Sequence, residues 1–351
     1  MSHLDILLPF ALPPAEIARD LLRELKAPAF AQLLSRARSG CNPARESFEG
    51  FHRALPHEIW LARCFDIEGS GSPQAAPGLM KAFGLPTEPG TWFLLQPVHI
   101  HIARDHLVLT DQRQLQIGDT EARELFSIAK ELFDEVGKPL LYGNASTWFV
   151  RADEWTQLQT STPDAAGGHN IDIWMPSGPG ERDWRKVQNE VQMHWFTHSA
   201  NADREASGRK PVNSIWLWGG GAFADCEDAP YAAAFNLDGW MQALAPRVQR
   251  HARADSAAAA LTGITGRSLA CLDTLIEPAM ANDWARWLTC MHELETAWFA
   301  PLLDALKSGK LQELTFILSD DAQLARFAVT RSSLRKFWVS PSLAPLAPAV
   351  S

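Results

Sequence analysis

Two histidines near the middle of this sequence have a spacing that could bind a metal ion. His99 and His101 are two residues apart in an apolar run, so both side chains would project from one face of a strand. A His-x-His pair of this kind can ligate zinc. Such short patterns also arise by chance, and His106 is the only further imidazole close by. The spacing therefore favours two ordinary strand histidines over a metal site.

A second candidate, Asn201 with Arg204, could hold an anion. The planar guanidinium of Arg204 can bind a phosphate or carboxylate through two parallel hydrogen bonds. The amide of Asn201, three residues earlier, could donate a further bond. The alternative is that both side chains belong to a structural hydrogen-bond network that orients this loop. The residue types leave both interpretations open.

Two segments that follow predicted strands could also bind ligands. Asp320 and Asp321 come directly after the apolar run 314–318, and α/β sheets place their sites at such strand ends. A lone carboxylate there could bind a cation weakly, but capping the next helix is favoured. Gly219 to Gly221 follow the run 214–218, and no Lys-Ser/Thr comes after them as in a phosphate-binding loop. A tight turn that lets the backbone pass close to a neighbour is predicted instead.

Composition limits the classes of partner. The chain has 351 residues, 46% of them hydrophobic, and a formal net charge of −9. This charge and the lack of a basic tract argue against a nucleic-acid surface and an anionic membrane surface. No apolar stretch is long enough for a membrane helix, and no secretory signal precedes the first strand. Five cysteines are scattered without a close pair, as expected for reduced thiols, and we expect a cytoplasmic protein.

Strands alternate with helices along the chain. The patterns predict strands at 4–8, 92–95, 98–102, 107–110, 214–218 and 314–318, and helices from 15, from 119 or 120 to 136, and from 283. The stretch 68–89 is predicted to be a loop, and the proline-rich tail after Trp338 to be disordered. This alternation predicts an α/β fold with a mainly parallel sheet, helices on both faces and an inserted central segment. Because 214–218 is apolar on both faces, it is expected to be a central parallel strand.

The segment from His198 to Gly221 resembles the signature of the archaeal-type cofactor-independent phosphoglycerate mutases. The matching positions are His198, Asn201, Arg204, Gly208, Pro211, Asn213, Ile215, Trp216, Leu217, Trp218, Gly219 and Gly221. Upstream, Thr162, Pro163, Asp164 and Gly167 are similar to a second loop of that family. The resemblance over the whole chain is closest to the bacterial RpfE-type regulatory proteins, which are relatives of those mutases.

The resemblance implies an alkaline-phosphatase-like fold with an inserted smaller α+β domain. It places the core in residues 1–90 and 205–340, the inserted domain in 91–204 and a disordered tail in 341–351. It also implies a mechanism with two divalent metals and a phosphorylated serine, the metals being held at four places in the sequence.

Those four places can be compared with this sequence. The opening strand, which should end in Asp-Gly, is followed by Pro9 and Phe10. The later strand that should end in Asp-His ends in Asp320 and Asp321, and no histidine occurs after His292. Of the loop before the long helix only Glu277 could be a ligand. The serine is not identifiable either, so neither a metal centre nor a cofactor is expected.

These observations favour a catalytically inactive member of the mutase group that acts as a binding or regulatory protein. We expect a small phosphorylated or carboxylated ligand, or a protein partner, but no nucleic acid or membrane. The expected ligand-binding residues are Asn201, Arg204, Asn213 and Asp164. The alternative is a metal-dependent phosphomutase or phosphotransferase with a rearranged site, built from Asp320, Asp321, Glu277, His99 and His101. A third possibility is a protein-interaction module, since exposed tryptophans are common at interfaces and the chain has 14 tryptophans.

Overall fold

The computed structural model describes residues 2–39, 44–104, 106–224, 229–264 and 266–347. Contacts divide the chain into two compact units, and each is a discontinuous part of the sequence. Unit 1 comprises Met1–Gly50, Glu227–Gly239 and Arg247–Ser351, and unit 2 comprises Phe51–Cys226 and Trp240–Pro246. The domain boundaries expected at residues 90 and 204 both fall inside unit 2.

Unit 1 is built on a seven-stranded sheet with the order β10-β9-β11-β1-β12-β13-β2. The strands are β1 (His3–Leu8), β2 (Ala44–Ser47), β9 (Ala233–Phe235), β10 (Arg250–Ala252), β11 (Arg267–Cys271), β12 (Glu313–Ser319) and β13 (Gln323–Thr330). Pairing is parallel from β10 to β12 and antiparallel from β12 through β13 to β2. The prediction of an α/β fold with a mainly parallel sheet is confirmed.

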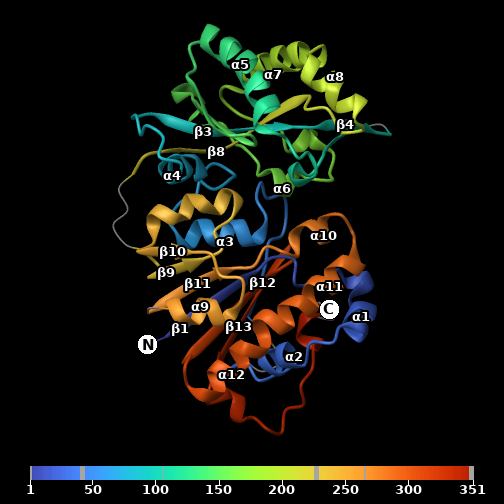
Figure 1. Ribbon diagram of the computed structural model, residues 1–351, viewed down its shortest axis with the longest axis vertical. Coiled ribbons are helices and arrows are strands. Elements are labelled where there is room, and N and C mark those ends of the chain that lie inside the picture. Colours follow the sequence, from blue (N-terminus) through green and yellow to red (C-terminus); the bar gives the residue numbers. More distant parts are fainter. Residues whose placement is uncertain (1, 40–43, 105, 225–228, 265, 348–351) are drawn as a thin grey trace. The chain divides into compact units, whose positions relative to one another are not determined.

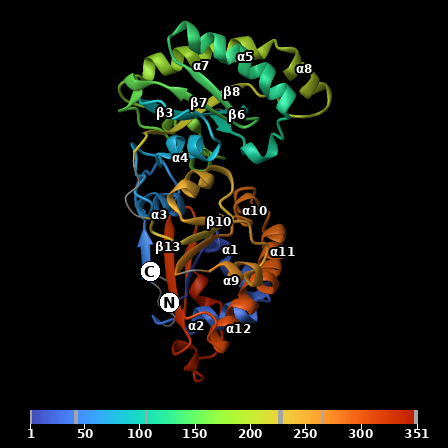
Figure 2. The ribbon, with the colours of Figure 1, turned by 60° about the vertical axis from the view of Figure 1, so that its left-hand side comes forward.

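Helices pack on one face of this sheet through a large apolar cluster. Leu4, Ile6 and Leu8 alternate along β1 and join this cluster with residues of the helices. Unit 1 contains α1 (Ala15–Glu24), α2 (Pro28–Ser35), α9 (Ala257–Gly263), α10 (Ile276–Met280), α11 (Trp284–Leu294) and α12 (Ala300–Ser308). Figure 2 shows α9, α11 and α12 gathered on the same side of the strands. These helices bury the apolar face of the parallel strands.

Local sequence explains where these helices begin. Asp283 caps α11, its Oδ1 accepting a hydrogen bond from the Arg286 amide at 2.9 Å. The α2 helix starts at Pro28 without a local side-chain cap. Its first amides, at Ala29 and Phe30, instead donate to the buried carboxylate of Glu295, at 2.7 and 3.1 Å. This long-range cap ties the π-helical turn Glu295–Phe299 between α11 and α12 to the start of the chain.

Unit 2 contains a four-stranded antiparallel sheet with the order β6-β7-β3-β8 and a separate hairpin of β4 and β5. Its strands are β3 (Thr91–Val98), β4 (Ile100–Ala103), β5 (His106–Leu109), β6 (Leu140–Asn144), β7 (Thr147–Arg151) and β8 (Ser214–Ala222). Its helices are α3 (Pro56–Cys64), α4 (Ala75–Ala82), α5 (Asp119–Glu135), α6 (Pro163–Ala166), α7 (Glu181–Phe196) and α8 (Ser199–Ala206). In Figure 1, α5 and α7 lie over one face of this sheet and α4 under the other.

The strand predicted at 214–218 exists, but its expected place in a parallel sheet is wrong. β8 is the last strand of the sheet in unit 2 and pairs antiparallel with β3. Ile215 and Leu217 join the apolar cluster that contains α5 and α7, whereas Trp216 and Trp218 join the cluster that contains α4. Helices on both faces make the strand apolar on both sides, and such burial does not specify the direction of pairing.

Four other predictions for local structure are corrected. β8 runs on through Gly219 to Ala222, so these glycines lie in the strand and not in a turn. A Cβ on Gly220 would lie 2.2 Å from the ring of Phe93, which explains the need for glycine by close packing. The stretch 68–89, which was expected to be a loop, contains α4. The N-cap residue of α5 is Gly118, and not Asp119 or Thr120. The tail is ordered as far as residue 347, because Leu346 is fully buried in the core of unit 1.

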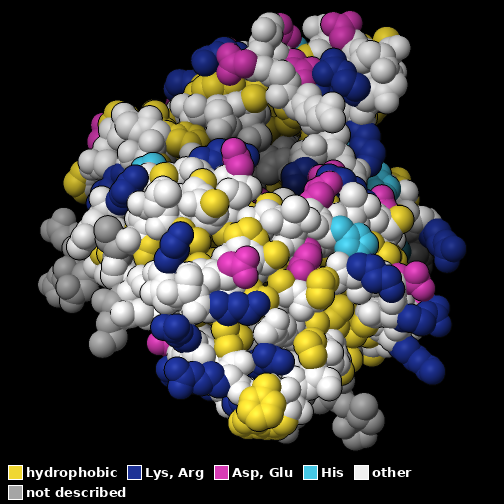
Figure 3. All heavy atoms as spheres, turned by 60° about the horizontal axis from the view of Figure 1, so that its bottom comes forward, with side chains coloured by type: hydrophobic (Ala, Val, Ile, Leu, Met, Phe, Trp, Pro, Cys, Tyr) yellow, Lys and Arg dark blue, Asp and Glu magenta, His cyan; other side chains and the backbone are white. Residues whose placement is uncertain are grey.

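The tryptophans are mostly core residues. Eight of the 14 tryptophan side chains are less than 2% exposed, and Trp338 is the only one among the exposed large hydrophobic residues. The tryptophan content therefore stabilises the interior and gives no support to a protein-interaction surface. Figure 3 shows one face of the molecule, on which Lys and Arg side chains gather beside exposed apolar groups.

In the described parts of the chain, Cys271 and Cys290 are free thiols, while Cys41 and Cys226 lie outside these parts. Within the same residues, no helix has the length and hydropathy required to cross a membrane.

Candidate functional site

The predicted anion holder, Arg204, is fully buried and bound to the protein itself. It lies in α8, and its Nη1 donates to the Glu121 carboxylate of α5 at 2.6 Å. Its Nε donates to the Lys210 carbonyl at 2.7 Å, and its Nη2 to the Leu115 carbonyl. All three nitrogens of the guanidinium therefore donate hydrogen bonds to groups within unit 2. This geometry favours the structural network over the ligand role that was expected for Arg204.

The two asparagines expected at the site are engaged in the same way. Asn201 is buried; its amide donates to the carbonyls of Trp195 and Val212, and its oxygen accepts from the Val212 amide at 2.7 Å. Asn213 forms a two-way pair with the backbone of Ile100, with both bonds at 2.8 Å. Asn201 thus fixes the loop between α8 and β8, and Asn213 fixes the start of β4.

Asp164 belongs to a different group of charged residues. It lies in the short helix α6, where its two oxygens accept from Arg113 at 2.9 and 3.1 Å. Arg113 also binds Asp111, at 2.9 Å. The carboxylate of Asp164 is therefore already paired with a cation, and its side chain is one-fifth exposed.

Next to this ion pair lies a buried carboxyl that the sequence did not reveal. Glu58 of α3 is 1% exposed, and its Oε2 accepts from the Leu55 amide at 2.8 Å and the Thr162 hydroxyl at 2.6 Å. Burial, with a contribution from the Asp164 carboxylate, raises the pKa of Glu58 to about 8. Burial, with Arg113 nearby, lowers the pKa of the adjacent His57 to about 3. At neutral pH both groups are therefore mainly uncharged.

The resemblance places the metal ligands of the mutases at strand ends such as those after β1 and β12 of unit 1. β1 is followed by Pro9 and Phe10, whose side chains have no ligating atom. After β12, the Oδ1 of Asp320 accepts from the amides of Ala322 and Gln323, at 2.8 and 2.6 Å. Asp320 thus caps the turn of the β12–β13 hairpin, and not a helix as expected. Glu277 is exposed on α10.

The candidate histidines also have protein partners. His99 Nδ1 bonds to the Pro211 carbonyl at 2.8 Å, and His101 Nδ1 to the Thr110 hydroxyl at 3.2 Å. Their rings stack with centroids 5.8 Å apart. Across the residues that the structure describes, no three His, Cys, Asp or Glu side chains form a group able to hold a metal ion.

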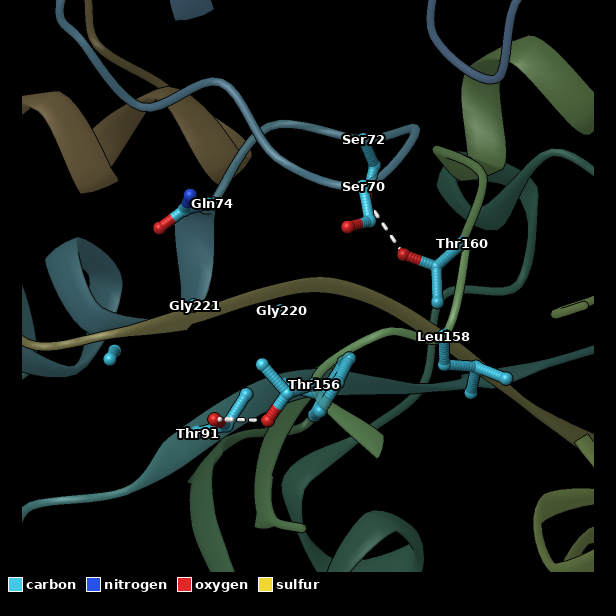
Figure 4. Close-up of a pocket in the computed structure, with 11 residues that line it drawn as sticks. Ser70, Ser72, Gln74, Thr91, Thr156, Leu158, Thr160, Gly220 and Gly221 are labelled. Carbon is cyan, nitrogen blue, oxygen red and sulfur yellow. Dashed lines mark hydrogen bonds between the residues drawn. The ribbon is translucent and has the colours of Figure 1, made fainter. Parts of the chain in front are cut away.

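Unit 2 also contains a polar pocket among its described residues, and this pocket is a further candidate for a ligand site (Figure 4). It has a volume of about 260 Å³ and is lined by Ser70, Ser72, Gln74, Thr91, Phe93, Thr156, Leu158, Thr160, Gly220, Gly221 and Ala222. The lining comes from the loop before α4, from β3, from the segment after β7 and from the end of β8. Figure 4 shows Ser72 facing Thr160 and Thr91 facing Thr156, each pair joined by a hydrogen bond.

Sequence comparison connects part of this chain to a phosphoglycerate mutase. No protein-family model matches the chain, so the resemblance to RpfE-type regulatory proteins stays a prediction. The 2,3-bisphosphoglycerate-independent phosphoglycerate mutase 2 of Methanothermobacter thermautotrophicus is 26% identical over 143 residues. The match covers 39% of this chain and about a third (35%) of the length of the mutase.

Two solved structures resemble the whole chain. The PH0037 protein of Pyrococcus horikoshii aligns with a TM-score of 0.54 and 11% identity, over 93% of this chain and 87% of that one. The cofactor-independent phosphoglycerate mutase of Thermoplasma acidophilum aligns with a TM-score of 0.46 and 14% identity, over 100% and 96%. The first likeness shows a shared fold, and the sequence match shows distant homology to the archaeal mutase over 143 residues of this chain.

Proposed function

We propose that this chain is a catalytically inactive relative of the phosphoglycerate mutases that acts as a binding or regulatory protein. The observation that carries the proposal is the chemistry of the residues at the strand ends of unit 1. Two-metal phosphoryl transfer needs carboxylates and imidazoles gathered at one place. Here Pro9 and Phe10 follow β1, and the Oδ1 of Asp320 accepts hydrogen bonds from two backbone amides.

The contacts of Arg204 argue against the ligand site first expected. An anion at its guanidinium would have to displace the Glu121 carboxylate or a backbone carbonyl, which would leave a buried group unpaired. The same holds for Asn201, whose amide already makes three hydrogen bonds. A ligand bound by this protein is therefore better sought at the polar pocket than at α8.

An assay of phosphoglycerate interconversion tests the proposal against the rearranged-site alternative. The full chain is incubated with 3-phosphoglycerate and Mn²⁺, Mg²⁺, Co²⁺ or Zn²⁺, and the products are followed by ³¹P NMR. We expect no 2-phosphoglycerate above the level of the metal-only blank, with the Methanothermobacter mutase as positive control. Metal-dependent turnover by this chain would contradict the proposal and favour the phosphomutase alternative.

A further inference from the structure

We propose that the polar pocket of unit 2 binds a small neutral polyhydroxylated molecule, such as a single sugar ring or a linear polyol. This inference deepens the proposed function, on which it rests, by naming the ligand class. It replaces the phosphorylated or carboxylated ligand with a neutral one.

The first argument is the charge of the pocket. None of the described residues that line it is charged, and six of them carry a hydroxyl or an amide. An anion entering such a site would lose hydration without gaining a counter-charge, and a cation would meet the same cost. A neutral ligand with many hydroxyls exchanges its bonds to water for bonds to these side chains.

The second argument is that Thr91 and Gln74, which line the pocket, offer acceptors. The Thr156 hydroxyl donates to the Asp153 carbonyl at 2.6 Å. Because a hydroxyl has one hydrogen, the 2.9 Å bond between Thr91 and Thr156 must be donated by Thr91. The lone pairs of Thr91 Oγ1 are then left to accept a hydrogen bond from a ligand. Gln74 donates from Nε2 to the Glu68 carbonyl at 2.6 Å, so its Oε1 also serves as an acceptor.

The pair of Ser72 and Thr160 in the same lining offers a donor. The Ser72 oxygen accepts from the Gly219 amide at 3.0 Å and shares a 2.8 Å bond with the Thr160 hydroxyl. Whichever of the two hydroxyls donates in this pair, the hydrogen of the other is left for a ligand. A ligand hydroxyl can donate to Thr91 or Gln74 and accept from this pair. Ionised phosphate and carboxylate oxygens can only accept hydrogen bonds. They would therefore be repelled by the acceptor atoms of Thr91 and Gln74.

The third argument is size. A volume of about 260 Å³ lies just below the range of roughly 300–1,000 Å³ that is typical of ligand pockets, which limits the occupant to a small molecule. The strand β8 forms part of the lining through backbone. A Cβ on Gly221 would lie 2.8 Å from Oε1 of Gln74 and would displace that amide.

The test uses saturation-transfer difference NMR on the full chain. The neutral probes are D-glucose, D-galactose, myo-inositol and D-mannitol, and the charged ones are D-glucose 6-phosphate and 3-phosphoglycerate. We expect transfer to at least one neutral probe, with weaker or no transfer to the charged ones. Thr91→Val and Thr160→Val each remove one hydroxyl at nearly constant shape. Each should weaken binding of that probe roughly 3- to 10-fold, as for one neutral hydrogen bond.

Thr197→Val is the matched control, since Thr197 is an exposed threonine at the end of α7 in the same unit. It should leave the affinity unchanged, and thermal melts should show that all variants are folded. The proposal is overturned if no neutral probe binds. It is also overturned if the charged probes bind as tightly as the neutral ones and neither Thr91→Val nor Thr160→Val changes the binding of any probe. Absence of binding without mutase turnover overturns this inference alone, whereas turnover contradicts the proposed function whatever the pocket binds.

Discussion

Arg204→Ala should destabilise the protein by about 3–5 kcal/mol, as does removal of one partner from other buried ion pairs. The substitution deletes three hydrogen bonds and leaves the carbonyls of Lys210 and Leu115 without their donor. It also leaves the mostly buried carboxylate of Glu121 with a weaker partner, Arg209, at 3.3 Å. Urea unfolding of the full chain at neutral pH, followed by tryptophan fluorescence, measures the change.

Arg209→Ala is the control, because Arg209 shares the same carboxylate but is 42% exposed. It should cost less than about 1 kcal/mol, as exposed pairs do. Arg204→Lys should recover little, since one ammonium cannot reproduce three bonds of the guanidinium fork. If Arg204→Ala were as stable as the wild type and had lost affinity for an anion, the guanidinium would be a ligand group and the structural role would be wrong.

Glu58→Gln should make the protein more stable than the wild type at alkaline pH. The pKa of Glu58 is about 8 in the folded protein and 4.5 in an unfolded reference chain. The folded state therefore holds a proton that the unfolded state releases between these values. Its contribution to stability is complete below pH 4.5 and is lost as the pH rises through 8. Glutamine can accept the same bonds from Leu55 and Thr162 without ionising.

The expected gain of Glu58→Gln over the wild type grows from pH 4.5 to pH 8, to a value on the order of 5 kcal/mol. His57 affects the stability in the acidic range. Its pKa is lowered to about 3 in the folded protein, so its contribution to the free energy of unfolding is lost as the pH falls below 6.5. Unfolding free energies of both proteins across this range measure the difference. The exposed Glu124→Gln is the control for the change in net charge. A difference that does not vary with pH would show that Glu58 is ionised in the folded protein.

Only those helices and strands with strong local signals could be predicted from the sequence, and strands such as β7, β11 and β13 were not predicted. The alternation in β1, the break at Pro28 and the cap at Asp283 all depend on neighbouring residues. The partner of β8 could not be predicted, since apolar residues on both faces are as compatible with an antiparallel sheet between helices as with a parallel one. The order of the tail depends on Leu346 finding a place in the core, which proline content does not reveal.

The candidate site was less predictable because side-chain partners come from distant segments. The residue type of Arg204 indicates that it can bind an anion. Its guanidinium already binds the carboxylate of Glu121, which lies 83 residues earlier in the chain. The Thr162–Glu58 bond spans 104 residues, and the Ser72–Thr160 bond spans 88. Isolated serines and threonines carry no sequence signal of a shared pocket. Positions 9 and 10 are simpler to interpret, because the side chains of Pro9 and Phe10 have no ligating atom in any surroundings.

Titration calorimetry of Mn²⁺ into the full, chelator-treated chain tests most directly whether the mutase metal site has been lost. With Pro9 and Phe10 after β1, and Asp320 bound to backbone amides, we predict no saturable heat at a stoichiometry of one or two ions per chain. The Methanothermobacter mutase, treated identically, serves as the reference protein. Tight binding of two Mn²⁺ ions by this chain, abolished in Asp320→Asn, would contradict the account.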